Sequence, residues 1–324
     1  MLTDILLASL GLVILLLAGD ALVRGAVNLA LRIGVPALLV SLTIVAFGTS
    51  APELLISVAA ILDGAPGIAM GNVVGSNTAN ILLVLGIPAL MSGLDTEGHD
   101  TRKTYTMMIA ASVLFIALAF VGPFTWWHGL ILLAGLSLVL GDAFRSARNH
   151  RRDNREAAAA AADEEEEIDL EGADVEMPGW KVALFLVLGL VGLPLGADIL
   201  VDSAKDIAAT LGVPDTVIGL TLVAVGTSLP ELATTVMAAI RRQADVALGN
   251  VIGSNMFNLL AIIGVSSFVG EIPVDPALLR FDLWVMLGAS LLLAPFVFLH
   301  WRMGRAWGVA LSALYMGYVY LVVA

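Results

Sequence analysis

The sequence predicts an all-α polytopic membrane protein, with about ten transmembrane helices in two inverted five-helix repeats. Three observations lead to this fold class. Hydrophobic residues make up 59% of the 324 residues and charged residues only 14%, with a mean hydropathy of +0.95. Two polar motifs recur in the same order in both halves, and nearly all basic residues fall on one side of the apolar segments. A soluble domain of this length does not have such a composition, so the chain is expected to lie in a lipid bilayer.

The apolar segments are each long enough to cross the hydrocarbon core, which takes roughly 20 helical residues. The first segment is not typical of a signal peptide, because it opens with Asp4 and lacks a basic leader. The predicted spans are 3–31, 36–62, 66–92, 104–122 and 125–144 in the first half, and 180–210, 214–240, 244–270, 279–299 and 304–323 in the second.

A polar linker at 145–178 divides the chain into a first repeat, 1–144, and a second repeat, 179–324. Each repeat contains five predicted spans. An odd number makes the second repeat enter the membrane from the opposite side, so the two repeats are expected to be inverted. Secondary transporters commonly use this architecture, with the substrate site at the midplane between the repeats.

The basic residues orient the spans. With the N-terminus outside, all 16 Lys and Arg residues except Lys205 and Arg280 fall on the inner side. The positive-inside rule therefore predicts that both termini lie outside and that the linker is cytoplasmic. We expect a multi-pass protein of the cell inner (plasma) membrane, in contact with the lipid bilayer.

The linker is of low complexity: it begins basic, passes through alanines and ends acidic. The acids between Asp163 and Glu176 account for much of the net charge of −12, so that charge does not indicate a binding partner. The run lacks the residue order of a calcium-binding loop. Neither a nucleic-acid partner nor an obligate protein partner is expected. The chain has no cysteine, which excludes disulfides and thiolate metal sites.

Two motifs show that the chain is a tandem duplication. The segment 48–54 (GTSAPEL) recurs at 226–232 (GTSLPEL), and 71–80 (GNVVGSNTAN) recurs at 249–258 (GNVIGSNMFN), both at an offset of 178 residues. The duplicated residues include a glutamate and several hydroxyls and amides within apolar sequence. Ionisable and polar groups at membrane depth are costly, so they indicate a functional site.

Glu53 and Glu231 lie within the second and seventh predicted spans, each directly after a proline. Because proline has no N–H, the helix loses a backbone hydrogen bond there, which leaves carbonyl oxygens free for another partner. A single glutamate beside a proline is also compatible with a structural kink. Its repetition at matched positions, with hydroxyls beside it each time, favours a binding site.

The surrounding side chains all offer oxygen ligands. Hydroxyls and amides in each repeat recur at the same offset, and the histidines lie at predicted span ends or in loops. An all-oxygen site suits Na⁺, Ca²⁺ or Mg²⁺, and two carboxylates with neutral oxygens suit Ca²⁺ best. The same polar residues can also serve as contacts between helices. They are Thr49, Ser50, Ser76, Asn77 and Asn80, with Thr227, Ser228, Ser254, Asn255 and Asn258 as their matches.

Asp20 and its match Asp198 are weaker candidates. Arg24 follows Asp20 by four residues, one helical turn further along the same face. An ion pair or a snorkelling side chain is therefore the expected role of Asp20.

At the two duplicated motifs the chain resembles the calcium/cation antiporter superfamily, and within it the prokaryotic sodium/calcium exchangers. The resemblance covers the whole chain outside the linker. It implies ten helices in two inverted repeats around four adjacent ion sites, with Na⁺ and Ca²⁺ as transported ions. It implies neither a catalytic residue nor a resident cofactor.

The resemblance also assigns roles to residues of this chain. It makes Glu53 and Glu231 the central calcium ligands, shared with sodium, and it makes Thr49 and Thr227 further calcium ligands. Sodium would be held by Ser50, Ser76, Ser228 and Ser254 together with the carbonyls of Ala46 and Ala224. Asn80 and Asn258 occupy the positions of a further polar pair. Some relatives have aspartate there, and the potassium-dependent branch ties that aspartate to potassium, so asparagine argues against potassium transport.

The expected function is secondary antiport of sodium against calcium by alternating access. A calcium/proton antiporter is the nearest alternative, although the proton-coupled branch has different glutamate motifs. A cation channel is less favoured, because channels usually form filters from rings of subunits. An intramembrane hydrolase is not supported, because neither H-E-x-x-H nor G-x-S-x-G occurs.

Overall fold

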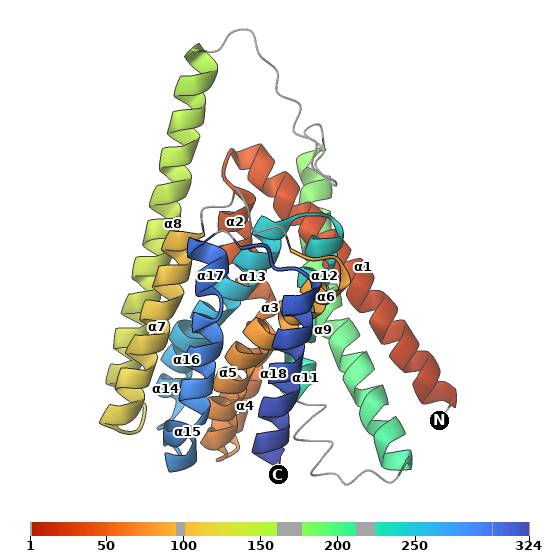
Figure 1. Cartoon of the computed structure of the whole chain (residues 1–324), viewed down its shortest axis with the longest axis vertical. Helices are drawn as coiled ribbons and strands as arrows, with labels where there is room; N and C mark the ends of the chain where they lie inside the picture. Colours follow the sequence, from red (N-terminus) through yellow and green to blue (C-terminus); the bar gives the residue numbers. More distant parts are fainter. Residues whose placement is uncertain (1, 95–100, 161–176, 212–223, 300, 324) are drawn as a thin grey trace.

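The computed structural model describes residues 2–94, 101–160, 177–211, 224–299 and 301–323 (Figure 1). Nearly all of these residues are helical, and the described part contains two isolated β-bridges and no strand. The first half contains α1 (Leu2–Ile33), α2 (Ala37–Val40), the π-helix η1 (Ser41–Val45), α3 (Ala46–Thr49), α4 (Ala51–Leu62), α5 (Pro66–Ala79), the π-helix η2 (Asn80–Val84), α6 (Gly86–Met91), α7 (Arg102–Val121) and α8 (Trp126–Ala160).

The second half repeats this order of long and divided helices through its third span, but its fourth span is divided, whereas α7 is one helix. It contains α9 (Gly179–Thr210), α11 (Ala224–Thr227), α12 (Leu229–Ile240), α13 (Ala244–Met256), the π-helix η4 (Phe257–Ile262), α14 (Ile263–Val269), α15 (Pro276–Arg280), α16 (Asp282–Leu291), α17 (Ala294–Phe298) and α18 (Arg305–Val323).

The helices confirm a polytopic membrane protein. Within the described residues, eight helical stretches are long and apolar enough to cross a membrane, and each matches a predicted span. Helix α18 coincides with the predicted tenth span. Of the predicted seventh span, 224–240 forms α11 and α12, while 214–223 lies outside the described residues. The count of ten spans and the inverted relation of the repeats stay predictions.

The predicted linker begins inside a helix. Helix α8 continues through the basic segment and ends at Ala160, so the first part of 145–178 extends the fifth span. Residues 161–176, which hold the whole acidic run, lie outside the described part.

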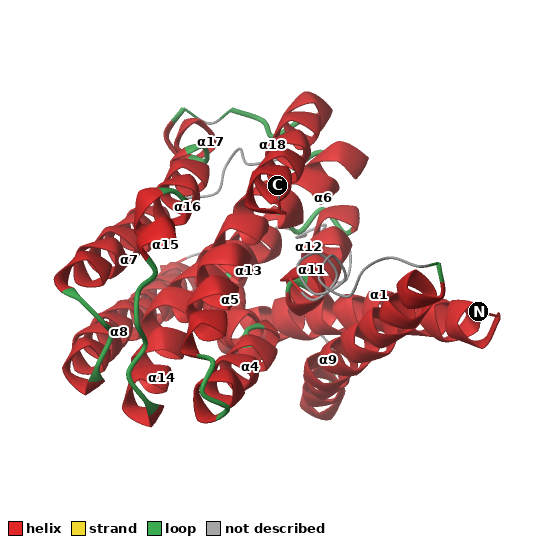
Figure 2. Ribbon diagram, turned by 90° about the horizontal axis from the view of Figure 1, so that it is seen from below, coloured by secondary structure: helices red, strands yellow, loops and turns green. Residues whose placement is uncertain are grey.

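Two hydrophobic clusters organise the packing. The larger one surrounds α5 and α13, which lie at the centre of the view in Figure 2. The smaller one joins α1 to α9 and also includes residues of α2, η1 and α12. Glycines bring α1 and α9 close together: a Cβ atom on Gly11 would lie 2.7 Å from Leu200 N, and one on Gly196 would lie 2.8 Å from Leu15 N. Helices α1 and α9 therefore form a tightly packed pair beside the main bundle.

Candidate ion-binding site

The duplicated prolines divide their spans into two helices. Ser50 separates α3 from α4 with φ −85° and ψ 1°, and Ser228 separates α11 from α12 with φ −88° and ψ 4°. Pro52 and Pro230 then lie in the first turn of the next helix, where a missing N–H costs nothing. The sequence predicted one helix with lost backbone hydrogen bonds at the proline, and the structure shows a one-residue break in the helix at Ser50 and at Ser228.

The interruption places both glutamates in the first turn of a helix, Glu53 in α4 and Glu231 in α12. The N-terminus of a helix carries partial positive charge, which stabilises a carboxylate there. Glu53 is 1% exposed and Glu231 is fully buried. The fold thus brings two acids from opposite halves of the chain into one buried site.

Hydroxyls from two elements face Glu231. Ser50 Oγ and Ser254 Oγ each donate to Glu231 Oε1 at 3.4 Å. Thr49 Oγ1 lies 3.3 Å from Ser254 Oγ and donates to Asn250 Oδ1 at 3.2 Å. The first-half motif and the second-half motif therefore contact each other directly around Glu231.

Several buried oxygens at this site have no hydrogen-bond partner within the described part of the protein. These are Glu53 Oε1 and Oε2, Glu231 Oε2, Ser228 Oγ, Asn77 Oδ1, Asn80 Oδ1 and Asn258 Oδ1. Buried polar atoms are nearly always paired, and a buried carboxylate without a partner is especially costly. Such a set of oxygens is what a dehydrated cation requires as ligands.

Asn72 and Asn250 hold the glutamate turns and were missed as site residues from sequence alone. Asn72 Nδ2 donates to Glu53 O and to Ser57 Oγ, both at 3.3 Å. Asn250 Nδ2 makes the matching contacts to Glu231 O at 3.3 Å and Thr235 Oγ1 at 3.2 Å. Both asparagines belong to the duplicated G-N-V segments, and that repetition was the available signal.

Amide contacts link α5 to α13. Asn80 Nδ2 donates to Asn255 Oδ1 at 3.0 Å, and Asn255 Nδ2 donates to Asn77 O at 3.3 Å. Asn77 Nδ2 instead returns to its own helix at Val73 O, 2.8 Å away. Asn80 and Phe257 each begin a π-helix, a distortion that occurs frequently at functional sites.

The predicted ligands differ in how directly the structure connects them to the glutamates. Thr49, Ser50, Ser76, Asn80, Thr227, Ser228, Ser254 and Asn258 are all buried, as are the two glutamates. The Ala46 carbonyl already accepts from Ser50 N at 3.0 Å, and Thr49 Oγ1 lies 3.3 Å from it. Ala224 begins α11 directly after the undescribed segment 212–223. Hydrogen bonds thus bring Ser50 and Ser254 to Glu231, while ligation by the two alanine carbonyls stays a prediction.

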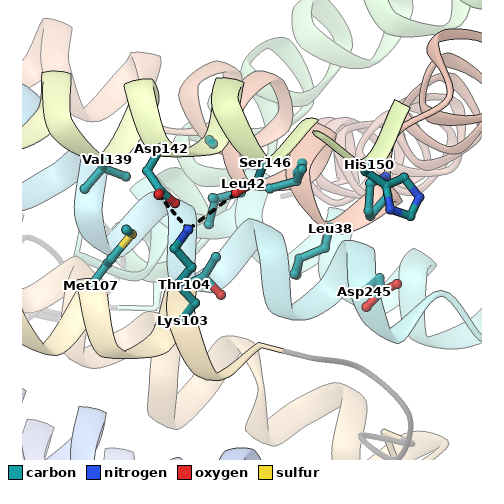
Figure 3. A pocket seen from close by; sticks show the side chains of 13 residues that line it. Leu38, Leu42, Lys103, Thr104, Met107, Val139, Asp142, Ser146, His150 and Asp245 are labelled. Carbon is teal, nitrogen blue, oxygen red and sulfur yellow. Dashed lines mark hydrogen bonds and ion pairs between the residues drawn. The ribbon is translucent and has the colours of Figure 1, made fainter. Parts of the chain in front are cut away.

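A cavity of about 380 Å³ lies elsewhere, between α2, α7, α8 and α13 (Figure 3). Lys103 Nζ there pairs with Asp142 Oδ1 at 2.6 Å and lies 3.5 Å from Ser146 Oγ. Leu38 and Leu42 contribute apolar wall. None of the predicted ion ligands lines this cavity, so it is separate from the glutamate site.

The ligand chemistry is restricted to oxygen. No group of three or more His, Cys, Asp or Glu side chains that could hold a metal occurs within the described residues. The hydroxyl and amide oxygens around the two glutamates are ligands that suit hard cations better than zinc or copper.

Buried oxygens within a polytopic helical bundle are typical of a membrane transporter for cations. The family model described as sodium/calcium exchanger protein matches residues 3–140 and 181–324. The chain therefore belongs to the sodium/calcium exchanger family, within the calcium/cation antiporters.

Individual relatives match along nearly their whole length. The putative antiporter CaxA of Alkalimonas amylolytica is 33% identical, over 99% of each chain. The sodium/calcium exchanger MaX1 of Methanosarcina acetivorans is 36% identical, over 98% of this chain and 97% of that one. A solved structure of the sodium-calcium exchanger NCX_Mj, soaked with Na⁺ and Sr²⁺, superposes with a TM-score of 0.80 at 32% identity, covering 98% of this chain and 97% of that one.

Proposed function

We propose that this protein is a secondary active antiporter that exchanges Na⁺ for Ca²⁺ by alternating access at the site around Glu53 and Glu231. One observation carries the proposal: two buried carboxylates, with three of their four oxygens unpartnered in the described part of the protein, lie among buried hydroxyls and amides. The charge of Ca²⁺ balances two carboxylates, and several Na⁺ ions can balance them as well.

Each ligand has a role in this proposal. Glu53 and Glu231 bind both ions, and Thr49 and Thr227 add oxygens to Ca²⁺. Na⁺ is bound by four serines and by the carbonyls of Ala46 and Ala224. The serines are Ser50, Ser76, Ser228 and Ser254. Asn80 and Asn258 supply neutral amides beside the site, and the lack of a third carboxylate there favours transport without K⁺. Both ions are cargo, and the proposal requires no resident cofactor and no protein partner.

Antiport follows from the electrostatics of the site. Two ionised carboxylates without cations are costly at membrane depth, so the empty transporter changes sides slowly. Either load removes that penalty. Because both loads use Glu53 and Glu231, they exclude each other, and net transport of one ion requires return of the other.

The proposed location is the inner (plasma) membrane, with both termini outside and residues 145–178 in the cytoplasm. The positive-inside distribution supports this orientation. Figure 1 agrees with it, because both termini lie at the lower end of the molecule, while the long upper part of α8 leads toward the linker.

Reconstituted vesicles test the function directly. Vesicles loaded with Na⁺ should take up Ca²⁺ when external Na⁺ is removed, and imposed K⁺ or H⁺ gradients should not drive uptake. Protons can neutralise the same two carboxylates, so calcium/proton exchange is the second candidate. Uptake that follows a pH gradient without Na⁺ would establish that alternative, and Ca²⁺ flux without any counter-ion would indicate a channel.

A further inference from the structure

Asp20 of α1 connects two parts of the protein that are far apart in sequence. Its Oδ1 accepts a hydrogen bond from Arg241 Nε, 221 residues away. Its Oδ2 forms an ion pair with Arg24 Nε at 3.0 Å, but the Arg24 Nε–H does not point at it closely enough to form a hydrogen bond. The side chains of Asp20 and Arg241 are only 20% and 16% exposed. The Asp20 to Arg24 pair was expected from sequence, whereas Arg241 was not.

Arg241 directly follows α12, whose first turn holds Glu231. Helix α1 also contacts α12 one residue before Asp20, because a Cβ atom on Gly19 would lie 3.0 Å from Ala233 O. Helices α1 and α9 share the smaller hydrophobic cluster, which also includes residues of α2, η1 and α12. The Asp20–Arg241 contact thus joins the α1/α9 pair to a helix that carries a central ligand.

The duplication offers a comparison for these three residues. At the offset of 178 residues, Asp20 matches Asp198, Arg24 matches Asp202, and Arg241 matches Asp63. All three matches are acidic. Asp198 is exposed, and Asp202 pairs with Lys205 of its own helix at 3.0 Å. Three acids cannot form equivalent ion pairs with one another, so α9 cannot be held against α4 as α1 is held against α12.

Resting on the proposed exchange function, we propose that Asp20, Arg24 and Arg241 are positioning residues that form a one-sided latch. The latch holds α1 against α12 at the predicted cytoplasmic side. Because all three matched positions are acidic, Asp198 and Asp202 in the second repeat and Asp63 in the first, the predicted outer side has no latch. The ion-free protein therefore favours the arrangement that is closed to the cytoplasm.

The size of the effect follows from the two ion pairs. Exposed ion pairs contribute little to stability, and the partial burial of the Asp20–Arg241 pair raises its contribution. Loss of the carboxylate should change the ratio of the two conformations on the order of fivefold. Such a change is measurable in the populations of the two conformations, even if the transport rate hardly changes.

Distances between spin labels test the latch without any transported ion. The chain has no cysteine, so single cysteines at the exposed residues Leu12 of α1 and Leu138 of α8 provide unique label positions. We expect one dominant distance in the otherwise unchanged protein. Asp20→Asn and Arg241→Gln should each raise a second population about fivefold. The double variant Asp20→Arg/Arg241→Asp should restore the dominant distance, whereas Asp20→Arg alone should not.

Asp198→Asn is the matched control, because it makes the same chemical change at the equivalent position of the other repeat. It should leave the distance distribution unchanged. Unchanged distances in Asp20→Asn and Arg241→Gln, or an equal change in Asp198→Asn, would overturn the latch. If the latch variants respond but the protein does not exchange Na⁺ for Ca²⁺, the proposed function fails while the latch stands. If one latch variant does not fold, the other still decides.

Discussion

Asn250→Ala tests whether the asparagine behind each glutamate organises the site. Asn250 is fully buried and makes three side-chain hydrogen bonds, at 3.2 to 3.3 Å, to Glu231 O, Thr235 Oγ1 and Thr49 Oγ1. A buried hydrogen bond contributes about 1 kcal/mol, so the variant should lose about 3 kcal/mol of unfolding free energy. Its affinity for Ca²⁺ should also fall, because the Glu231 turn and Thr49 lose their shared anchor.

The matched variant Asn72→Ala gives the comparison. Asn72 is half-buried and makes only the two contacts to Glu53 O and Ser57 Oγ. It should lose about 2 kcal/mol. Denaturant titration in detergent measures the stability of each variant, and equilibrium binding of ⁴⁵Ca²⁺ measures the affinity. Ser137→Ala, which removes one exposed contact within a helix, should stay within about 0.5 kcal/mol of the parent. A loss in Asn72→Ala equal to or larger than that in Asn250→Ala would refute the reasoning.

Three further predictions concern the ligands and the linker. Glu53→Gln and Glu231→Gln should each abolish Ca²⁺ exchange in vesicles without loss of folded protein, because each removes half the charge that balances Ca²⁺; exchange at the parent rate would remove that glutamate from the site. Deletion of 157–176 should leave exchange largely intact, and loss of exchange in a normally folded deletion variant would show that the acidic run is regulatory or structural. The last prediction concerns four variants that each remove one serine hydroxyl: Ser50→Ala, Ser76→Ala, Ser228→Ala and Ser254→Ala. Each should weaken Na⁺ inhibition of Ca²⁺ binding more than it weakens Ca²⁺ binding itself, because the carboxylates remain. If every variant keeps the parent Na⁺ dependence, these serines are packing residues.

Hydropathy was sufficient to predict where most spans begin. The spans predicted to begin at residues 36 and 66 begin at Ala37 and Pro66 in the structure. The end of the fifth span was less predictable, because α8 continues as a helix through charged residues to Ala160. Apolar composition marks where a helix lies in lipid, but it does not mark where a helix ends in water.

The candidate site was predictable in composition but not in its contacts. The duplication singled out Glu53 and Glu231, because a repeated acid in lipid requires a reason. The contact between Asn80 and Asn255, or between Asp20 and Arg241, joins residues far apart in the chain. Sequence periodicity reports which face of a helix a residue lies on, whereas these contacts depend on how whole helices pack.

Equilibrium binding of ⁴⁵Ca²⁺ to the purified protein at increasing Na⁺ concentration tests the central claim, that both ions use the same two carboxylates. The account predicts purely competitive displacement: Na⁺ raises the apparent dissociation constant for Ca²⁺ without a limit, and saturating Ca²⁺ restores full occupancy. An apparent dissociation constant that reaches a plateau at high Na⁺ would mean that both loads bind together, and it would contradict a shared site at Glu53 and Glu231.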